Sequence, residues 1–196
     1  GLLSVNLHIP LVRFMAADRS RGAEVYATLL VATLGFAGAG AVLIALFAEP
    51  VGLALLGTRG VNAYLQFGAL LMLIANLRNL NLNVYRATNR LLVRSVVELV
   101  NAVGELIGIF ILLRRGDSLL TVFAFMVVWE GAVALLQTAH CLAITGWVAP
   151  VRRVFNESIR SALPLIPASF SVWVLDRVDR FVIGSWWGAT AVGVYS

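Results

Sequence analysis

The chain has 196 residues, of which 60% are apolar and 13% are charged. Soluble domains contain about 45–50% apolar and about 25% charged residues, so this composition excludes an ordinary soluble domain, a disordered chain and a collagen-like repeat, and a single cysteine excludes a disulfide scaffold. The net charge of +5 comes from arginines that lie at the ends of apolar runs, which is typical of a membrane protein, and we expect an all-α fold. A nucleic-acid-binding protein gathers its basic residues on one solvent-exposed face, so we expect no nucleic-acid partner.

Apolar runs of about 20 residues, the length that crosses a bilayer, predict five complete membrane-spanning helices. They cover residues 26–48, 61–85, 91–113, 119–145 and 161–187. The opening run, residues 1–17, is too short for a span and lacks the charged head of a signal peptide, so we interpret it as the end of a further helix. We therefore expect a partial polytopic transmembrane helix bundle with about six spans, belonging to a longer protein.

The arginines alternate between the junctions that join these runs. The junctions around residues 16–25, 86–94 and 146–160 carry nine arginines, whereas the intervening junctions carry three. The nine are Arg13, Arg19, Arg21, Arg86, Arg90, Arg94, Arg152, Arg153 and Arg160, and the three are Arg59, Arg114 and Arg115. By the positive-inside rule the first set lies in the cytoplasm, so we expect a multi-pass protein of the inner membrane.

The run 91–113 carries a stripe of polar residues, Arg94, Glu98, Asn101 and Glu105, spaced four, three and four residues apart. This spacing places all four on one face of a helix. One interpretation is an Arg94–Glu98 pair within the helix together with buried hydrogen bonds to other helices. The other is a helix that lines a water-filled path, because ionisable groups within spans usually face a cavity or a partner.

The preceding run is polar on two opposite faces, one with Asn76, Asn79 and Asn83 and the other with Arg78 and Asn81. Such a helix lies either inside the bundle or at the membrane edge, where Arg78 would reach water. Arg78 is the candidate for a buried cation, and its guanidinium fork suits a phosphate group.

Other polar positions carry weaker signals. Glu130 and Gln137 share one face and could join the same cavity, whereas His140 is expected to be structural, as is His8. The Gly104/Gly108 pair favours close helix packing. We find no metal-ligand spacing, phosphate loop or catalytic triad, and we expect no metal, no cofactor and no catalytic residue.

The last run opens with two prolines and then carries Asp176, Arg177, Asp179 and Arg180. The prolines bend or open the start of a helix. Four charges in five residues fit either salt bridges that orient the helix or a polar cavity that faces a substrate, and the sequence leaves both interpretations open.

Three segments near this end resemble the Wzx-type polysaccharide and O-antigen flippases of the multidrug/oligosaccharidyl-lipid/polysaccharide flippase superfamily. They are SALPLIP (161–167), DRFVIG (179–184) and AVGVYS (191–196). The helix ends LVRF (11–14) and VYRATNR (84–90) are similar to those of the family, more diffusely.

The resemblance implies a larger two-bundle transporter. Residues 1–160 would form the first bundle with its first helix truncated, and residues 161–196 would begin the second. It also implies translocation of undecaprenyl-diphosphate-linked oligosaccharide across the inner membrane by alternating access, without enzymatic activity, and partners that include membrane lipids and the polysaccharide polymerase machinery for lipopolysaccharide.

On this hypothesis Arg78, Arg94, Arg180 and Asn101 bind the substrate, and Glu98, Glu105 and Asp179 couple transport to protons or sodium. A multidrug efflux transporter of the same superfamily is the first alternative, and it would favour an acidic cavity for cationic substrates. An integral membrane enzyme of envelope polysaccharide synthesis is the second alternative. Such an enzyme needs catalytic acids in a solvent-exposed loop, whereas the loops of this chain are short and mostly basic. A membrane scaffold without transport is disfavoured by the aligned polar stripes.

Overall fold

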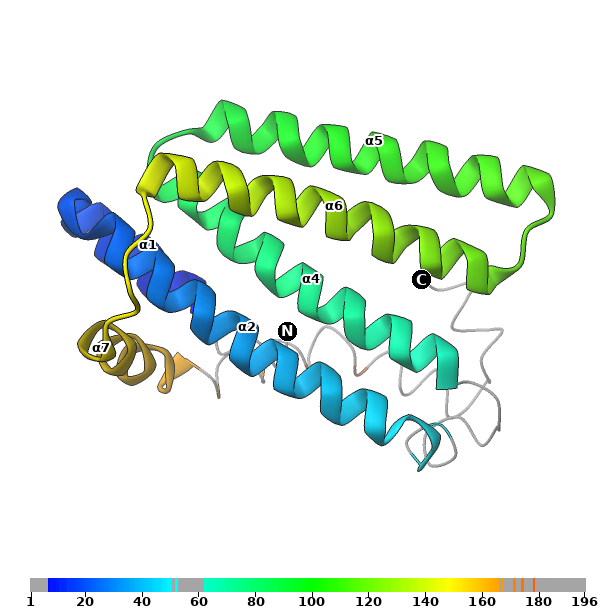
Figure 1. Ribbon diagram of the computed structural model, residues 1–196, viewed down its shortest axis with the longest axis horizontal. Helices are drawn as coiled ribbons and strands as arrows, with labels where there is room; N and C mark the ends of the chain where they lie inside the picture. The colour runs from blue at the N-terminus through cyan, green and yellow to red at the C-terminus, as the bar shows by residue number, and fades with distance from the viewer. Residues whose placement is uncertain are drawn as a thin grey trace.

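The computed structural model describes residues 7–50, 52 and 62–165, and the single positions 167, 171, 174 and 178. This part of the chain contains helices and no strand, which confirms the predicted all-α bundle. The helices are α1 (His8–Ala17), the short 3-10 helix η1 (Arg19–Arg21), α2 (Gly22–Leu46), α4 (Asn62–Ala87), α5 (Leu91–Arg115), α6 (Leu119–Thr145) and α7 (Arg152–Ala162). Figure 1 shows the four long helices lengthwise, with successive helices running in opposite directions.

Three helices of the described chain, α2, α5 and α6, are long and apolar enough to cross a membrane. They contain 25, 25 and 27 residues, and at 1.5 Å per residue each exceeds the roughly 30 Å of a hydrocarbon core. They coincide with three of the predicted spans. We conclude that the protein is membrane-embedded.

The remaining two predicted spans have different outcomes. Helix α4 covers the predicted span 61–85 and has 26 residues. Its asparagines and arginines make it less apolar than α2, α5 and α6. The run 161–187 lies largely outside the described residues, and so do Arg180 and Asp179.

Helix α4 lies at the centre of the bundle and contacts α1, α2, α5 and α6. Residues 80–85 near its C-terminal end are all buried, with Leu80, Val84 and Tyr85 at 2% exposure or less. Tyr26 and Leu29 of α2 are equally buried in the same apolar core. The most polar long helix therefore contacts four other helices and buries its C-terminal end among them, as expected for a position inside the bundle.

Helix α5 has the opposite pattern of burial. Its large apolar side chains face outward, with Leu92, Leu99 and Leu106 between 64% and 78% exposed, while Asn101 is 5% exposed. A helix on the surface of a soluble domain buries its apolar stripe and exposes its polar residues. An apolar exterior over a polar interior is the arrangement that suits hydrocarbon surroundings.

The three arginine-rich junctions lie at the same end of the bundle (Figure 1). Ser20 and Thr88 from two of the junctions, and Thr145 directly before the third, line a common polar pocket of about 290 Å³ at that end. The α5–α6 turn, which carries Arg114 and Arg115, lies at the opposite end. In the described chain the three arginine-rich junctions therefore lie opposite the α5–α6 turn, and Arg59 lies outside the described residues.

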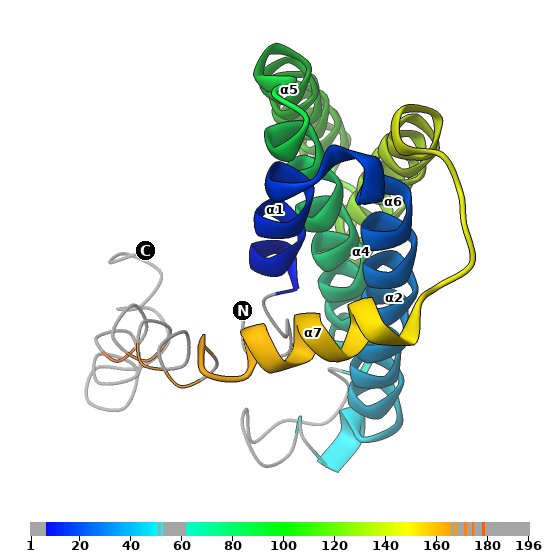
Figure 2. The same cartoon turned by 90° about the vertical axis from the view of Figure 1, so that its left-hand side faces the viewer.

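Helix α7 was not predicted. We expected residues 146–160 to be a connecting junction and a span to begin at residue 161, but Arg152–Ala162 form one amphipathic helix that lies across α1 and α2 (Figure 2). Val154 and Ser158 are buried on its inner face, whereas Arg152 and Arg160 are exposed. The expected boundary between residues 160 and 161 therefore falls inside a helix.

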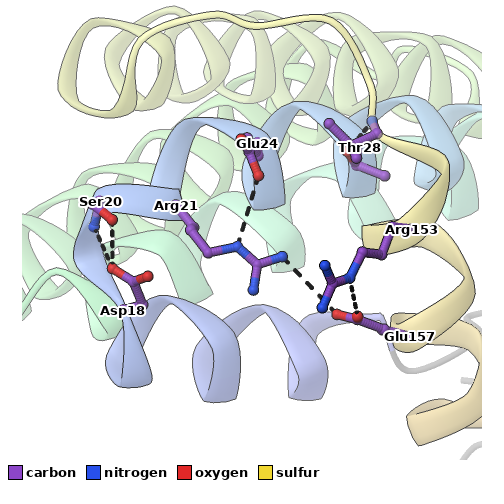
Figure 3. Close-up of polar contacts among 8 residues, drawn as sticks. Asp18, Ser20, Arg21, Glu24, Thr28, Arg153 and Glu157 are labelled. Carbon is purple, nitrogen blue, oxygen red and sulfur yellow. Dashed lines mark hydrogen bonds and ion pairs between the residues drawn. The ribbon is translucent and has the colours of Figure 1, made fainter.

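Polar contacts attach α7 to the start of α2 (Figure 3). Arg21 lies between Glu24 and Glu157, with N–O distances of 3.7 and 4.0 Å, and Arg153 Nε donates to Glu157 Oε1 at 2.8 Å. The backbone N–H of Val151 donates to Thr28 Oγ1 at 2.9 Å. The hydrogen bond from Arg153 holds the pKa of Glu157 below its usual value.

Candidate functional site

Polar side chains from three helices meet where α4, α5 and α6 pack together. Arg78 Nη1 of α4 donates to Glu130 Oε2 of α6, and Asn101 Nδ2 of α5 donates to Glu130 Oε1 at 2.9 Å. The Arg78 and Glu130 side chains are 17% and 12% exposed. Both carboxylate oxygens of Glu130 are therefore engaged by donors from other helices, in the interior of the bundle.

Glu105 lies close enough to Glu130 and Arg78 to interact electrostatically with both. We call these four residues, Arg78, Asn101, Glu105 and Glu130, the central cluster. It contains two carboxylates against one guanidinium, so it carries an excess negative charge when all three groups are ionised. Among the described residues, the buried Arg78 Nε and Asn101 Oδ1 atoms have no hydrogen-bond partner. The central cluster therefore retains an unused donor and an unused acceptor.

Two glycines of α5 bring the helices close enough for these contacts. A Cβ atom at Gly104 would overlap the Trp129 ring, and one at Gly108 would overlap the Phe125 ring. Trp129 Nε1 also donates to the backbone carbonyl of Asn101 at 3.2 Å. The close packing predicted for the glycine pair is confirmed, and it fixes the position of Asn101 beside Glu130.

A second polar network joins α2, α4 and α6. The Tyr26 hydroxyl donates to Asn81 Oδ1 at 2.7 Å, and Asn81 Nδ2 donates to Thr138 Oγ1 at 2.9 Å. Cys141 Sγ lies 3.7 Å from the backbone carbonyl oxygen of Asn81. Because its polar atoms find partners within the protein, this network has the properties of a structural connection between helices.

The structure brings only some of the predicted site residues together. Arg78, Asn101 and Glu105 belong to the central cluster. Arg94 and Glu98 instead form a pair within α5, with 3.3 Å between Arg94 Nε and Glu98 Oε2 and side chains 32% and 43% exposed. This is the first of the two interpretations of the α5 stripe, a pair within the helix together with hydrogen bonds between helices.

Glu130 is predicted from the sequence only as a secondary polar position and not as a site residue. The available signal was a carboxylate in the middle of an otherwise apolar run. Charged groups within spans usually pair with one another, so the opposite charges Arg78 and Glu130, each inside a predicted span, form a pair that the sequence alone could suggest. His140 was expected to be structural, and its Nδ1 lies 3.1 Å from the Tyr85 hydroxyl.

Within the described residues, no group of three His, Cys, Asp or Glu side chains could hold a metal ion. Comparison with protein-family models, with curated proteins and with solved structures returned no match. The resemblance of the C-terminal motifs to the Wzx-type flippases therefore stays a prediction.

Proposed function

We propose that the chain is part of a membrane transporter that moves undecaprenyl-diphosphate-linked oligosaccharide across the inner membrane by alternating access. The observation that carries this proposal is the central cluster, a set of ionisable side chains enclosed between apolar helices. Charged groups are costly at such a position and commonly mark a substrate or ion pathway. The specific substrate comes from the resemblance of segments 161–167, 179–184 and 191–196 to the flippases.

In this proposal Arg78 is the anchor for the diphosphate. Glu130 accepts a hydrogen bond from the Arg78 guanidinium when no substrate is present. A phosphate replaces it by accepting two hydrogen bonds from the guanidinium, one of them from the unused Arg78 Nε. The released Glu130 carboxylate, already beside Glu105, would then lie in apolar surroundings without a positive partner. Uptake of a proton or a sodium ion by this pair neutralises the charge, which couples ion movement to substrate movement. No covalent bond forms or breaks.

The proposed orientation places the arginine-rich end in the cytoplasm. Single cysteines at two exposed positions at opposite ends of the bundle, Asp117 and Asn156, test this orientation. The native cysteine is removed by Cys141→Ala. A membrane-impermeant maleimide should label Asp117→Cys in cells whose inner membrane is intact, and Asn156→Cys only after that membrane is permeabilised. The reverse order of labelling would contradict the orientation.

A cation-coupled efflux transporter of the same superfamily is the second candidate. The observation in its favour is the excess of carboxylates in the central cluster, where Glu105 and Glu130 face a single arginine. Such a site suits a cationic substrate better than an anionic one.

Transport by the full-length protein in proteoliposomes separates the two candidates. The flippase proposal predicts translocation of a lipid-linked oligosaccharide, its loss in Arg78→Ala and its retention in Arg13→Ala, which removes an exposed arginine of α1. Accumulation of a cationic dye without movement of the lipid-linked sugar would replace the flippase with the efflux transporter. Unchanged sugar transport in Arg78→Ala would remove that residue from the mechanism.

A further inference from the structure

An apolar pocket of about 300 Å³ lies between α4, α5 and α6, near the arginine-rich end of the bundle. Its walls include Val97 and Val100 of α5 and Val133 of α6. Toward the opposite end of the bundle the two helices are held together at Gly104 and Trp129. The pocket is therefore a separate feature from the central cluster, formed where α5 and α6 are less closely packed.

One polar side chain in this pocket lacks a hydrogen-bond partner. Gln137 of α6 lines the pocket and is 3% exposed, yet neither its Oε1 nor its Nε2 atom is hydrogen-bonded within the described chain. A buried amide without partners costs free energy. No group of the lining is placed to form a hydrogen bond with Gln137.

The end of the pocket nearest the arginine-rich junctions is polar. Tyr85 and His140 line it there, with 3.1 Å between the Tyr85 hydroxyl and His140 Nδ1. The exposed Arg90 donates its backbone N–H to the Tyr85 carbonyl at 2.7 Å, and its guanidinium lies close enough to the Tyr85 hydroxyl to interact electrostatically. Among the described residues Arg90 pairs with no carboxylate.

Three kinds of group therefore follow one another along the pocket. His140, Gln137 and Val133 occupy successive turns of α6, about 4.5 and 6 Å apart along the helix axis. The order is the Tyr85–His140 pair, with Arg90 within electrostatic reach of Tyr85, then an amide, then apolar walls. A glycerophospholipid carries its groups in the same order: a phosphate, an ester carbonyl and an acyl chain. A polyprenyl phosphate has no carbonyl between its phosphate and its chain and would leave the Gln137 amide unpaired.

We propose that this pocket binds an anionic glycerophospholipid, with one acyl chain between α5 and α6, an ester carbonyl on Gln137 Nε2 and the phosphate at Arg90. The volume accommodates part of one acyl chain, so the rest of that chain and the second chain stay in the surrounding bilayer. The site is distinct from the central cluster, and the proposal does not depend on what the protein transports.

Titration of the purified full-length protein with phosphatidylglycerol, followed by native mass spectrometry, tests the proposal. The ester-linked lipid should bind about three- to tenfold more tightly than its ether-linked counterpart, which lacks the carbonyl. Gln137→Leu should remove this difference. Arg90→Gln should reduce the preference for phosphatidylglycerol over phosphatidylcholine, whereas Arg152→Gln, which removes another exposed arginine at the same end, should leave it unchanged.

Filling the pocket provides an independent test. Val100→Trp should abolish the bound lipid, and Leu135→Trp, on an exposed face of α6, should not. If Val100→Trp fails to fold, the affinities for ester-linked and ether-linked lipid, compared in the wild type and in Gln137→Leu, still test the proposal. Equal affinity for ester and ether lipids in the wild type would overturn the proposal. Displacement of phosphatidylglycerol by a lower concentration of polyprenyl phosphate would overturn it as well, since the pocket would then prefer a lipid without the carbonyl.

Discussion

Arg78 of α4 and Glu130 of α6 form an ion pair in the interior of the bundle, and Asn101 of α5 supplies the second hydrogen bond to the same carboxylate. Three helices are thus joined through one side chain. Removing one member of a buried ion pair leaves an uncompensated charge, which costs more than the loss of the attraction itself. The stability of the bundle should therefore depend on the two residues jointly.

We predict that Arg78→Leu or Glu130→Leu alone lowers stability by about 3–5 kcal/mol, whereas the double variant loses much less. The measurement is thermal or denaturant unfolding of the purified protein in detergent, arranged as a double-mutant cycle. Replacing the exposed Arg94–Glu98 pair in the same way is the matched control and should change stability by less than about 1 kcal/mol. Additive losses for Arg78 and Glu130 would contradict the coupling.

We predict that Gly104→Ala destabilises the α5–α6 contact, because the added Cβ displaces the Trp129 ring and breaks its hydrogen bond to the Asn101 carbonyl. Overpacking of this kind typically costs about 1–3 kcal/mol. At Gly68, which lies in α4 with open space around its Cβ position, the same substitution should be neutral or stabilising because alanine favours a helix. Unfolding of both variants checks the prediction, and equal stability of the two would refute it.

The attachment of α7 should weaken in acid. The hydrogen bond from Arg153 within α7, and to a smaller extent the charge of Arg21 at the start of α2, lower the pKa of Glu157 from its ordinary value of 4.5. Both contributions are complete above that value and are lost as the pH falls through the lower pKa of the folded state, and the loss of the Arg21 contact weakens the attachment. A spin label at Asn156→Cys should become more mobile over this range. In Glu157→Gln the label should be mobile at neutral pH, with no further change on acidification.

Asp18 titrates in the same region and needs its own control. Hydrogen bonds from Ser20 lower the pKa of Asp18, so its contribution is also lost in acid. Asp18 lies at the start of η1, away from the Arg153–Glu157 pair on α7. The acid response of the label should therefore persist in Asp18→Asn, and its disappearance there would assign the effect to η1.

Cys141, the one cysteine of the sequence, should be inert in the folded protein. Its side chain is completely buried and contacts the Asn81 carbonyl oxygen. We expect negligible modification by a maleimide under native conditions and rapid modification after unfolding, read by mass spectrometry of the peptide that contains it. The exposed variant Ser118→Cys provides the positive control. Rapid modification of Cys141 in the native state would show that the α2–α4–α6 network opens readily.

The sequence predicts α2, α5 and α6 well because a long apolar run depends on no other part of the chain. It predicts the face of α5 that carries Asn101 for the same reason, since helical periodicity is local. The partner of Asn101 is not local: Glu130 approaches it only because Gly104 and Gly108 admit the rings of Trp129 and Phe125. The relative position of α5 and α6 depends on packing between helices, and the periodicity of one helix carries no information about that packing.

Helix α7 illustrates the other limit. The arginines of residues 146–160 do not distinguish a connecting loop from an amphipathic helix, because a charged segment suits both. Val154, Ser158 and Ala162 recur at every fourth position and are all buried, so the periodicity was present. A short helix of this kind is stabilised by the surface that it contacts more than by its own sequence.

The pairing of Arg78 with Glu130 also sets a sequence of events during synthesis of the protein. Glu130 follows Arg78 by 52 residues, and at about 5–20 residues per second the ribosome needs roughly 3–10 s to produce it. Until then α4 holds an arginine without its carboxylate, in a helix that is less apolar than its neighbours. Helix α4 should therefore leave the insertion machinery late, together with α6, so that the least apolar helix enters the lipid only with its partner.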